Sequence, residues 1–244
     1  TTAAAHDLLV SLLFCYPAFA AAEQWGRLVG KSIAYRSSLE SIAPILSRPV
    51  APDDDAELGT FDTIGLRKIA FQHPGSPWLF TAVTLDLHQG DVVALSGPSG
   101  SGKSTFLRVL MGLQPPSRGH LCVNGQVLPS QPDSHYRRQI GAVFQDQELG
   151  FSTIANAVLQ DLPGKNEADA WLAIEAVGLA DAVREMPMGM KTLLVAGAFP
   201  FGLTRQVLIA RALLEEPCLL VLDEALSALD AEIVATIIAY ARTR

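Results

Sequence analysis

The sequence predicts an α/β fold in which a mostly parallel sheet carries helices on both faces. Three apolar runs, at residues 92–95, 140–144 and 219–222, have the length and composition of strands buried in a parallel sheet. Segments with helical spacing of apolar residues separate these runs along the chain. Each run also leads directly into a polar or glycine-rich stretch, and ligands gather at the carboxyl ends of parallel strands.

Composition limits the class of protein. The chain has 244 residues, of which 49% are hydrophobic, so it can hold one large domain with an appendage or two small domains. Its net charge of -7 and the lack of a Lys/Arg-rich run argue against nucleic acid as a partner. Cys15, Cys122 and Cys218 are odd in number and far apart, so we expect no disulfide framework and a reducing compartment.

The first 50 residues form a region of their own. Residues 1–22 contain an apolar run of about 15 residues, which suits either a buried or amphipathic helix or a truncated membrane span. Residues 23–46 have helical spacing, and the acidic residues 53–55 indicate a solvated linker. We therefore divide the chain into residues 1–50 and a domain at residues 51–244.

An antiparallel β portion opens the domain near residue 60. Apolar positions from 64 to 71 predict a strand with an irregularity, and residues 73–77 predict a turn. Residues 83–87 alternate as a second strand. A further short strand at residues 121–127 has a turn at Asn124-Gly125.

A helical insertion, about residues 150–215, is expected between the second and third apolar runs. Residues 153–186 have helical character, with Gly178 ending a helix. A second helix covers residues 203–214 and is closed by Pro217. The last helix begins at about Asp230.

The most specific motif is S-G-P-S-G-S-G-K-S-T at residues 96–105, which has the spacing G-x-x-x-x-G-K-[ST] of a phosphate-binding loop. Its glycines let backbone N–H groups approach phosphate oxygens, and the following helix adds positive potential. Lys103 brings a full charge to the β- and γ-phosphates, and the Ser104 hydroxyl is placed to ligate Mg²⁺. We expect ATP and Mg²⁺ to bind there, through Gly97, Pro98, Ser99, Gly100, Ser101, Gly102, Lys103, Ser104 and Thr105.

Two further sets of polar residues follow the other apolar runs. Asp223 and Glu224 follow residues 219–222, where Asp223 can hold the Mg²⁺ shell and Glu224 can orient water against the γ-phosphate. The alternative is a helix N-cap. Gln145 follows residues 140–144, and its amide oxygen can reach Mg²⁺ or the water; the alternative is an ordinary loop amide.

These residues resemble the ATP-binding-cassette ATPases, and in particular the exporter branch. The resemblance covers residues 60–244 and includes residues 144–146 (FQD), 209–213 (IARAL) and 222–230 (LDEALSALD). It implies a P-loop NTPase fold in which Gln145 is the Q-loop glutamine, Glu224 the catalytic carboxylate and residues 227–230 the D-loop that crosses to a partner. It also places His73 where the family stacks an aromatic ring on adenine, although His73 before Pro74 also suits a turn.

The resemblance extends to the regions around these motifs. Residues 185–192 look like the stretch ahead of the signature motif in bacteriocin and peptide exporters. Residues 1–50 resemble the end of an exporter's last membrane helix and its cytoplasmic extension. This favours the truncated-span interpretation of residues 1–22, and it implies a fragment of a longer protein.

Three departures from the family pattern stand out. The signature Leu-Ser-Gly-Gly-Gln falls at residues 199–203, which read F-P-F-G-L. The loop before it, from Thr192 onward, is short. The chain also stops at Arg244, before the next strand and the histidine that the family places after it.

The expected function is the ATPase domain of a transporter that exports a peptide or small molecule at the cytoplasmic face of the membrane. The resemblance implies two partners: a transmembrane domain, and a second ATPase subunit that could be a different chain with an intact signature. Two alternatives remain open: a regulatory domain that binds ATP without hydrolysing it, and the ATPase subunit of an importer.

Overall fold

The computed structural model describes residues 61–130, 132–160, 162–195 and 199–243, together with Arg36 and Ala43, which are in helical conformation. Internal contacts divide the chain into two units, Thr1–Ala51 and Pro52–Arg244. All the elements given below belong to the second unit.

The interpretations of residues 1–22 and 53–55 fall outside the residues that the structure describes, and that of residues 23–46 does so except at Arg36 and Ala43. Within the described ranges, no helix combines the length and apolar character that a membrane crossing needs.

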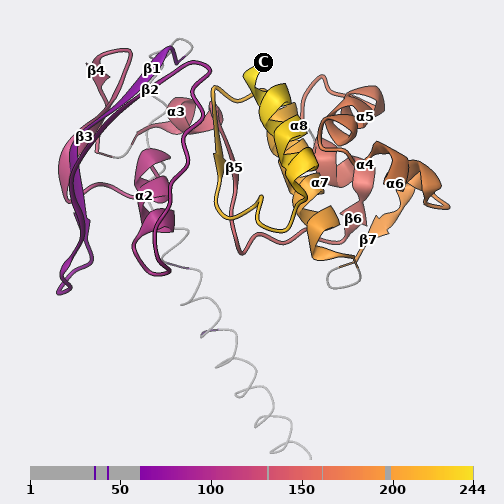
Figure 1. The fold of residues 1–244 in the computed structure, drawn as a ribbon, viewed down its shortest axis with the longest axis horizontal. Helices are drawn as coiled ribbons and strands as arrows, with labels where there is room; N and C mark the ends of the chain where they lie inside the picture. Colours follow the sequence, from indigo (N-terminus) through magenta and orange to yellow (C-terminus); the bar gives the residue numbers. More distant parts are fainter. Residues whose placement is uncertain are drawn as a thin grey trace, which may run out of the picture. The chain divides into compact units, whose positions relative to one another are not determined.

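A four-stranded antiparallel sheet opens the second unit, in the order β2-β1-β3-β4 (Figure 1). Its strands are β1 (Thr63–Gln72), β2 (Trp78–His88), β3 (Arg118–Val123) and β4 (Gln126–Val127). The predicted turns connect them. Asn124 and Gly125, with φ of 50° and 80°, have the left-handed conformations that a two-residue hairpin requires. The antiparallel β portion expected near the start of the domain is therefore confirmed.

The irregularity expected in the first strand lies between Leu66 and Ile69, where the register with β2 shifts. At this bulge Lys68 has φ of 49°, and its amide donates to Thr84 Oγ1 at 3.2 Å. On the other side of β1, a Cβ added to Gly119 would lie 2.4 Å from a backbone carbonyl oxygen of the bulge. The bulge therefore requires glycine at the facing position of β3.

Helices α2 (Lys103–Leu110) and α3 (Ser134–Arg138) pack against this sheet. Figure 1 shows the strands curving around α2. In α3, Tyr136 is fully buried, and its hydroxyl donates to the carbonyl oxygen of Leu110 at 2.6 Å. Burial raises the pKa of the Tyr136 phenol above its ordinary value. The buried members of this cluster are Phe61, Ile64, Leu66, Ile69, Phe71, Val109, Leu110, Leu121, Val123, Leu128 and Tyr136.

Strands β5 (Ile140–Val143) and β8 (Leu219–Leu222) form a parallel pair, in register from Ile140 with Leu219 to Val143 with Leu222. Ile140 and Leu219 pack against the cluster of α2 and α3. Val143 and Leu222 belong to a second cluster, which is formed with the helices that follow. The pair therefore has helical cover on both faces, and the α/β class is confirmed.

The prediction of a further parallel strand at residues 92–95 is wrong for this structure. Residues 91–98 form no strand, and the side chains of Val92, Val93 and Leu95 are 52%, 57% and 44% exposed. The three sheets among the described residues leave this segment out. An apolar run becomes a strand only when a neighbouring strand pairs with its backbone, and no described strand does so here.

The expected helical insertion lies between β5 and β8. Its helices are α4 (Ile154–Leu159), α5 (Glu167–Ala176), α6 (Ala180–Glu185), the 3₁₀ turn η1 (Gly189–Lys191) and α7 (Phe201–Leu214). The short strands β6 (Ser152–Thr153) and β7 (Leu193–Leu194) pair antiparallel, and α8 (Ala231–Arg242) follows β8. Helix α7 packs against both α4 and α5, and most of its side chains after the first turn are buried.

The boundaries differ from the prediction in two places. Residues 153–186 form three helices. Helix α4 ends where Gln160 adopts a left-handed conformation with φ of 39°, and α5 begins after Asn166, whose side chain caps it. Gly178, with φ of 71°, follows the end of α5 as expected. Helix α7 begins two residues earlier than predicted, at Phe201.

Candidate functional site

The phosphate-loop segment, residues 96–105, connects the unpaired stretch after β2 to α2. Lys103 is the first residue of α2, and its ammonium donates to the carbonyl oxygens of Gly97 at 2.9 Å and Pro98 at 3.0 Å. The lysine therefore folds back across the loop. Residues 96–101 are exposed, so the loop is accessible to a ligand.

The start of α2 suits an anion. Its N-cap is Gly102, which has φ of 92° and provides no side chain to accept from the first N–H groups. The first turn also has no acidic side chain. A Cβ at Gly102 would lie 2.5 Å from Cγ of Leu79, so this close approach also requires glycine. The free N–H groups and the helix dipole leave positive potential at the loop.

Gln145 and the pair Asp223-Glu224 lie at the carboxyl end of the β5–β8 pair. Val143 and Leu222 are the last partners in the register, and the amide of Asp223 donates to Val143 O at 2.9 Å. The polar residues after the two strands therefore lie at one edge, as the sequence predicts.

Asp223 has the environment of a cation ligand. It is only 6% exposed, and its carboxylate makes no hydrogen bond or ion pair to any described residue. A carboxylate that no protein donor occupies is free to bind a divalent cation, and carboxylate oxygens are preferred ligands of Mg²⁺. The residues present therefore fit Mg²⁺.

Glu224 has a strained backbone, with φ of 55°. The turn is held by Ser227, whose hydroxyl donates to Glu224 O at 2.7 Å. The Glu224 side chain is exposed. Left-handed conformations of non-glycine residues cluster at functional sites, so this turn is consistent with a functional role for Glu224.

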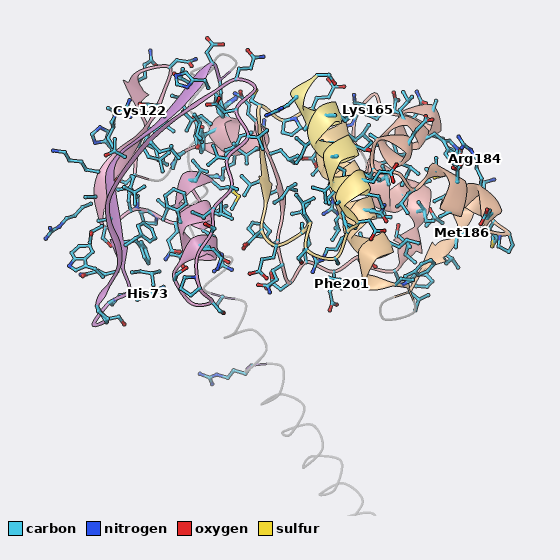
Figure 2. All side chains as sticks on the ribbon, in the orientation of Figure 1. His73, Cys122, Lys165, Arg184, Met186 and Phe201 are labelled. Atoms are coloured by element: carbon cyan, nitrogen blue, oxygen red, sulfur yellow. The ribbon has the colours of Figure 1, made fainter. Side chains whose placement is uncertain are left out.

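His73 lies in the turn between β1 and β2 (Figure 2). Its carbonyl oxygen accepts from the amide of Ser76 at 3.0 Å, as a turn residue would. Its ring stands edge-on to Phe71, with centroids 5.1 Å apart, and the residue is exposed. The ring is therefore accessible for stacking.

The segment that corresponds to the signature starts α7. Pro200 is the N-cap, and no side chain caps the helix. Phe201 is 59% exposed in the first turn, and a Cβ at Gly202 would lie 3.4 Å from Ala228 O. The segment thus presents an aromatic ring in place of the hydroxyl and glycine that the family pattern has.

The phosphate loop and the residues at the end of the β5–β8 pair are not linked directly in the part of the chain that the structure describes. Among the described residues, no hydrogen bond or ion pair joins the phosphate loop to Gln145 or Asp223. A hollow of about 870 Å³ lies on the antiparallel sheet beside Trp78, Arg118 and His120, and none of its lining residues belongs to the loop.

One buried residue was missed by the sequence reasoning. Arg205 in α7 is 3% exposed and donates to the backbone that carries Gln145. The signal was a single cation between the apolar positions Leu203 and Val207 of a buried helix.

Comparison with known proteins identifies a family and individual proteins that are similar to this chain. Residues 80–227 match the family described as "ABC transporter". The chain is similar to the leukotoxin export ATP-binding protein LtxB of Aggregatibacter actinomycetemcomitans, with 36% identity over 174 residues, covering 69% of this chain and 24% of that protein. It is 35% identical over 173 residues to ATP-binding cassette sub-family B member 5 of Mus musculus, covering 69% of this chain and 14% of that protein.

A solved structure is also similar. It is that of a bacterial Atm1-family ABC exporter with ATP bound, with a TM-score of 0.72 and 25% identity. The likeness covers 84% of this chain and 37% of that chain. The chain thus spans about a quarter or less of the curated relatives given above.

Proposed function

The chain belongs to the ABC transporter family, and on that premise we propose that it is the ATP-binding and hydrolysing motor domain of an export transporter. The family's ATPase domains are P-loop NTPases that bind nucleotide. The observation that carries the proposal is the phosphate loop, where Lys103 crosses the loop and no side chain caps the start of α2.

ATP would be held mainly by the phosphate loop. The donors for the β- and γ-phosphates are the Lys103 ammonium and the backbone N–H groups of residue 97 and residues 99–105, since Pro98 has no N–H. The exposed His73 ring would stack on adenine, with less contact area than a tyrosine.

Mg²⁺ would be held by the Ser104 hydroxyl, the Gln145 amide oxygen and the Asp223 carboxylate, a set of hard oxygen ligands. When bound, the ion neutralises charge on the phosphates. Glu224 would accept a proton from the attacking water and orient it toward the γ-phosphorus. Asp223, which is 6% exposed and whose carboxylate has no hydrogen-bond partner among the described residues, and the exposed Glu224 support this division of roles.

The transport role comes from the relatives, two of which carry export in their names. The proposed cargo is a peptide or a small molecule. Export of a bacteriocin would be a more specific proposal, and the names of these relatives do not mention it. The motor would work at the cytoplasmic face with a transmembrane domain, in the same chain or a partner, and with a second ATPase subunit.

The altered signature supports low activity for the chain alone. In the family each nucleotide lies between the loop of one subunit and the signature of the other. Pro200 has no N–H to donate, and Phe201 adds bulk where a close approach is needed. The same observation favours a second candidate, a regulatory domain that binds ATP with little or no hydrolysis.

Steady-state ATP hydrolysis separates the two candidates. We expect Glu224→Gln in the intact transporter to lower kcat at least a hundredfold while ATP binding is retained, because only the proton acceptor is lost. Glu175→Gln, an exposed glutamate on α5, is the control and should leave kcat unchanged. Equal hydrolysis by Glu224→Gln and the unmodified protein would contradict the motor assignment.

A further inference from the structure

Arg205 is a buried cation without a carboxylate partner among the described residues. It lies in the second turn of α7 and is 3% exposed. None of the ion pairs between described residues involves it. Arginine is seldom buried unless its charge is compensated, so the contacts of its guanidinium indicate what it does.

The hydrogen bonds of the guanidinium all go to one loop. Arg205 Nη1 donates to Phe144 O at 2.8 Å and to Gln147 O at 3.3 Å, and Nη2 donates to Gln145 O. The loop that follows β5 is thus held by its backbone carbonyls, while the Gln145 side chain stays exposed. A planar guanidinium can reach three carbonyl oxygens at once, which a lysine ammonium cannot do with the same geometry.

The other end of the link is the first turn of α7. Phe201 lies four residues before Arg205, on the same helix face, and its ring centroid is 4.5 Å from the guanidinium carbon. Figure 2 shows Phe201 at the start of the helix, and its side chain is 59% exposed. The guanidinium therefore lies between an exposed aromatic ring and the Gln145 loop.

We infer that Arg205 is a positioning residue that fixes the Gln145 loop to the first turn of α7, with Phe201 as the exposed end of the link. Through the backbone of residues 144–147 it sets where the Gln145 amide lies relative to Asp223. A contact made on Phe201 is thereby coupled to the metal ligands at the end of β5 and β8. This inference rests on the role proposed above for Gln145.

The neighbouring residue provides a matched control. Gln206 is also buried in α7, at 6% exposed, and its amide nitrogen donates to Val177 O at 2.7 Å. It anchors α7 to the end of α5, and among the described residues it makes no hydrogen bond to the loop of residues 144–147. If the only effect were a general loosening of α7, changes at Arg205 and Gln206 should act alike. Release of the loop at residues 144–147 should follow only from changing Arg205.

The first readout is amide hydrogen exchange at Phe144 and Gln147 in the 244-residue chain, without nucleotide. We expect Arg205→Met to speed their exchange at least tenfold, Arg205→Lys to have a smaller effect, and Gln206→Met to stay within twofold of the unmodified chain. If Arg205→Met does not fold, the same comparison is made with Arg205→Lys and with Phe201→Leu, which removes the ring against the guanidinium but none of its hydrogen bonds to the loop. Equal acceleration by Gln206→Met, or no acceleration by the Arg205 variants, would overturn the inference.

The second readout is the apparent Mg²⁺ affinity, measured by titrating Mg²⁺ into the chain with a ribose-labelled fluorescent ATP analogue. We expect Arg205→Met to weaken it at least fivefold, and Arg205→Met combined with Gln145→Ala to be no weaker than Gln145→Ala alone, since coupled residues are not additive. A weakened Gln145→Ala beside an unaffected Arg205→Met would overturn this inference alone. An unaffected Gln145→Ala would overturn the proposed metal role of Gln145, and with it the positioning role of Arg205.

Discussion

Tyr136 joins α3 to α2 through one hydrogen bond inside the core, and its removal can be measured. Tyr136→Phe leaves Leu110 O without its donor, so we expect the free energy of unfolding at pH 7 to fall by about 1–2 kcal/mol. Chemical denaturation provides the value. As a control, Thr236→Val removes an exposed hydrogen bond to Glu232 O and should change stability by less than about 0.5 kcal/mol.

The pH dependence of Tyr136 has a definite sign. Because burial raises the pKa of the phenol, its contribution to stability is fully present below the unfolded-state pKa of about 10 and is lost as pH rises through the folded-state pKa. The advantage of the unmodified chain over Tyr136→Phe should therefore shrink above pH 10. An advantage that grows between pH 9 and pH 11 would contradict this.

The positions of residues that belong to a local sequence motif were predictable from the sequence. Lys103 and Asp223 each occupy a fixed place after a glycine-rich turn or an apolar strand, and the structure puts them there. Arg205 and Tyr136 were not predictable, since their partners lie 60 and 26 residues away along the chain. Their roles arise from tertiary packing alone.

At the scale of elements, the contribution of residues 92–95 to stability can be compared with that of α2 through one valine in each. Val93 is 57% exposed in the unpaired segment, whereas Val109 is fully buried in α2. We expect Val93→Ala to change the free energy of unfolding by less than about 0.5 kcal/mol and Val109→Ala to lower it by about 2 kcal/mol. Similar losses for both variants would show that residues 92–95 form a buried strand in solution.

The elements that were predicted best have strong local signals. The strand at residues 219–222 is a continuous apolar run that finds its partner in β5, and Asn124-Gly125 forms the predicted hairpin turn. Residues 92–95 have equal apolar character but no paired neighbour, so the same signal failed there. In the helical part, the break at Gln160 and the cap at Asn166 divide a stretch that looks continuous in hydrophobicity.

At the scale of the whole molecule, the altered signature predicts an asymmetric pair of ATPase subunits. In the proposed function the phosphate loop, Asp223 and Glu224 would serve hydrolysis, whereas residues 199–203 would be a poor surface for a partner's ATP. We expect the isolated chain to hydrolyse ATP very slowly, and a different subunit with an intact signature to restore turnover at the loop of this chain. We expect slow hydrolysis at the second site, where residues 199–203 of this chain would face the partner's nucleotide.

Co-purification of the intact transporter, followed by counting of the ATP hydrolysed at each site, tests this asymmetry. A homodimer with full activity at both sites would rule it out. A homodimer with little activity at either site would favour the regulatory candidate.

The central claim, that this chain binds ATP through its phosphate loop, is tested most directly by calorimetric titration of MgATP into the 244-residue chain. We expect one binding event per chain and an affinity at least tenfold weaker in Lys103→Ala, because only backbone donors then remain for the phosphates. Lys165→Ala, which removes a lysine paired with Glu216 in the helical part, should bind as the unmodified chain does. An unchanged affinity for Lys103→Ala, or no binding by the unmodified chain, would contradict the claim.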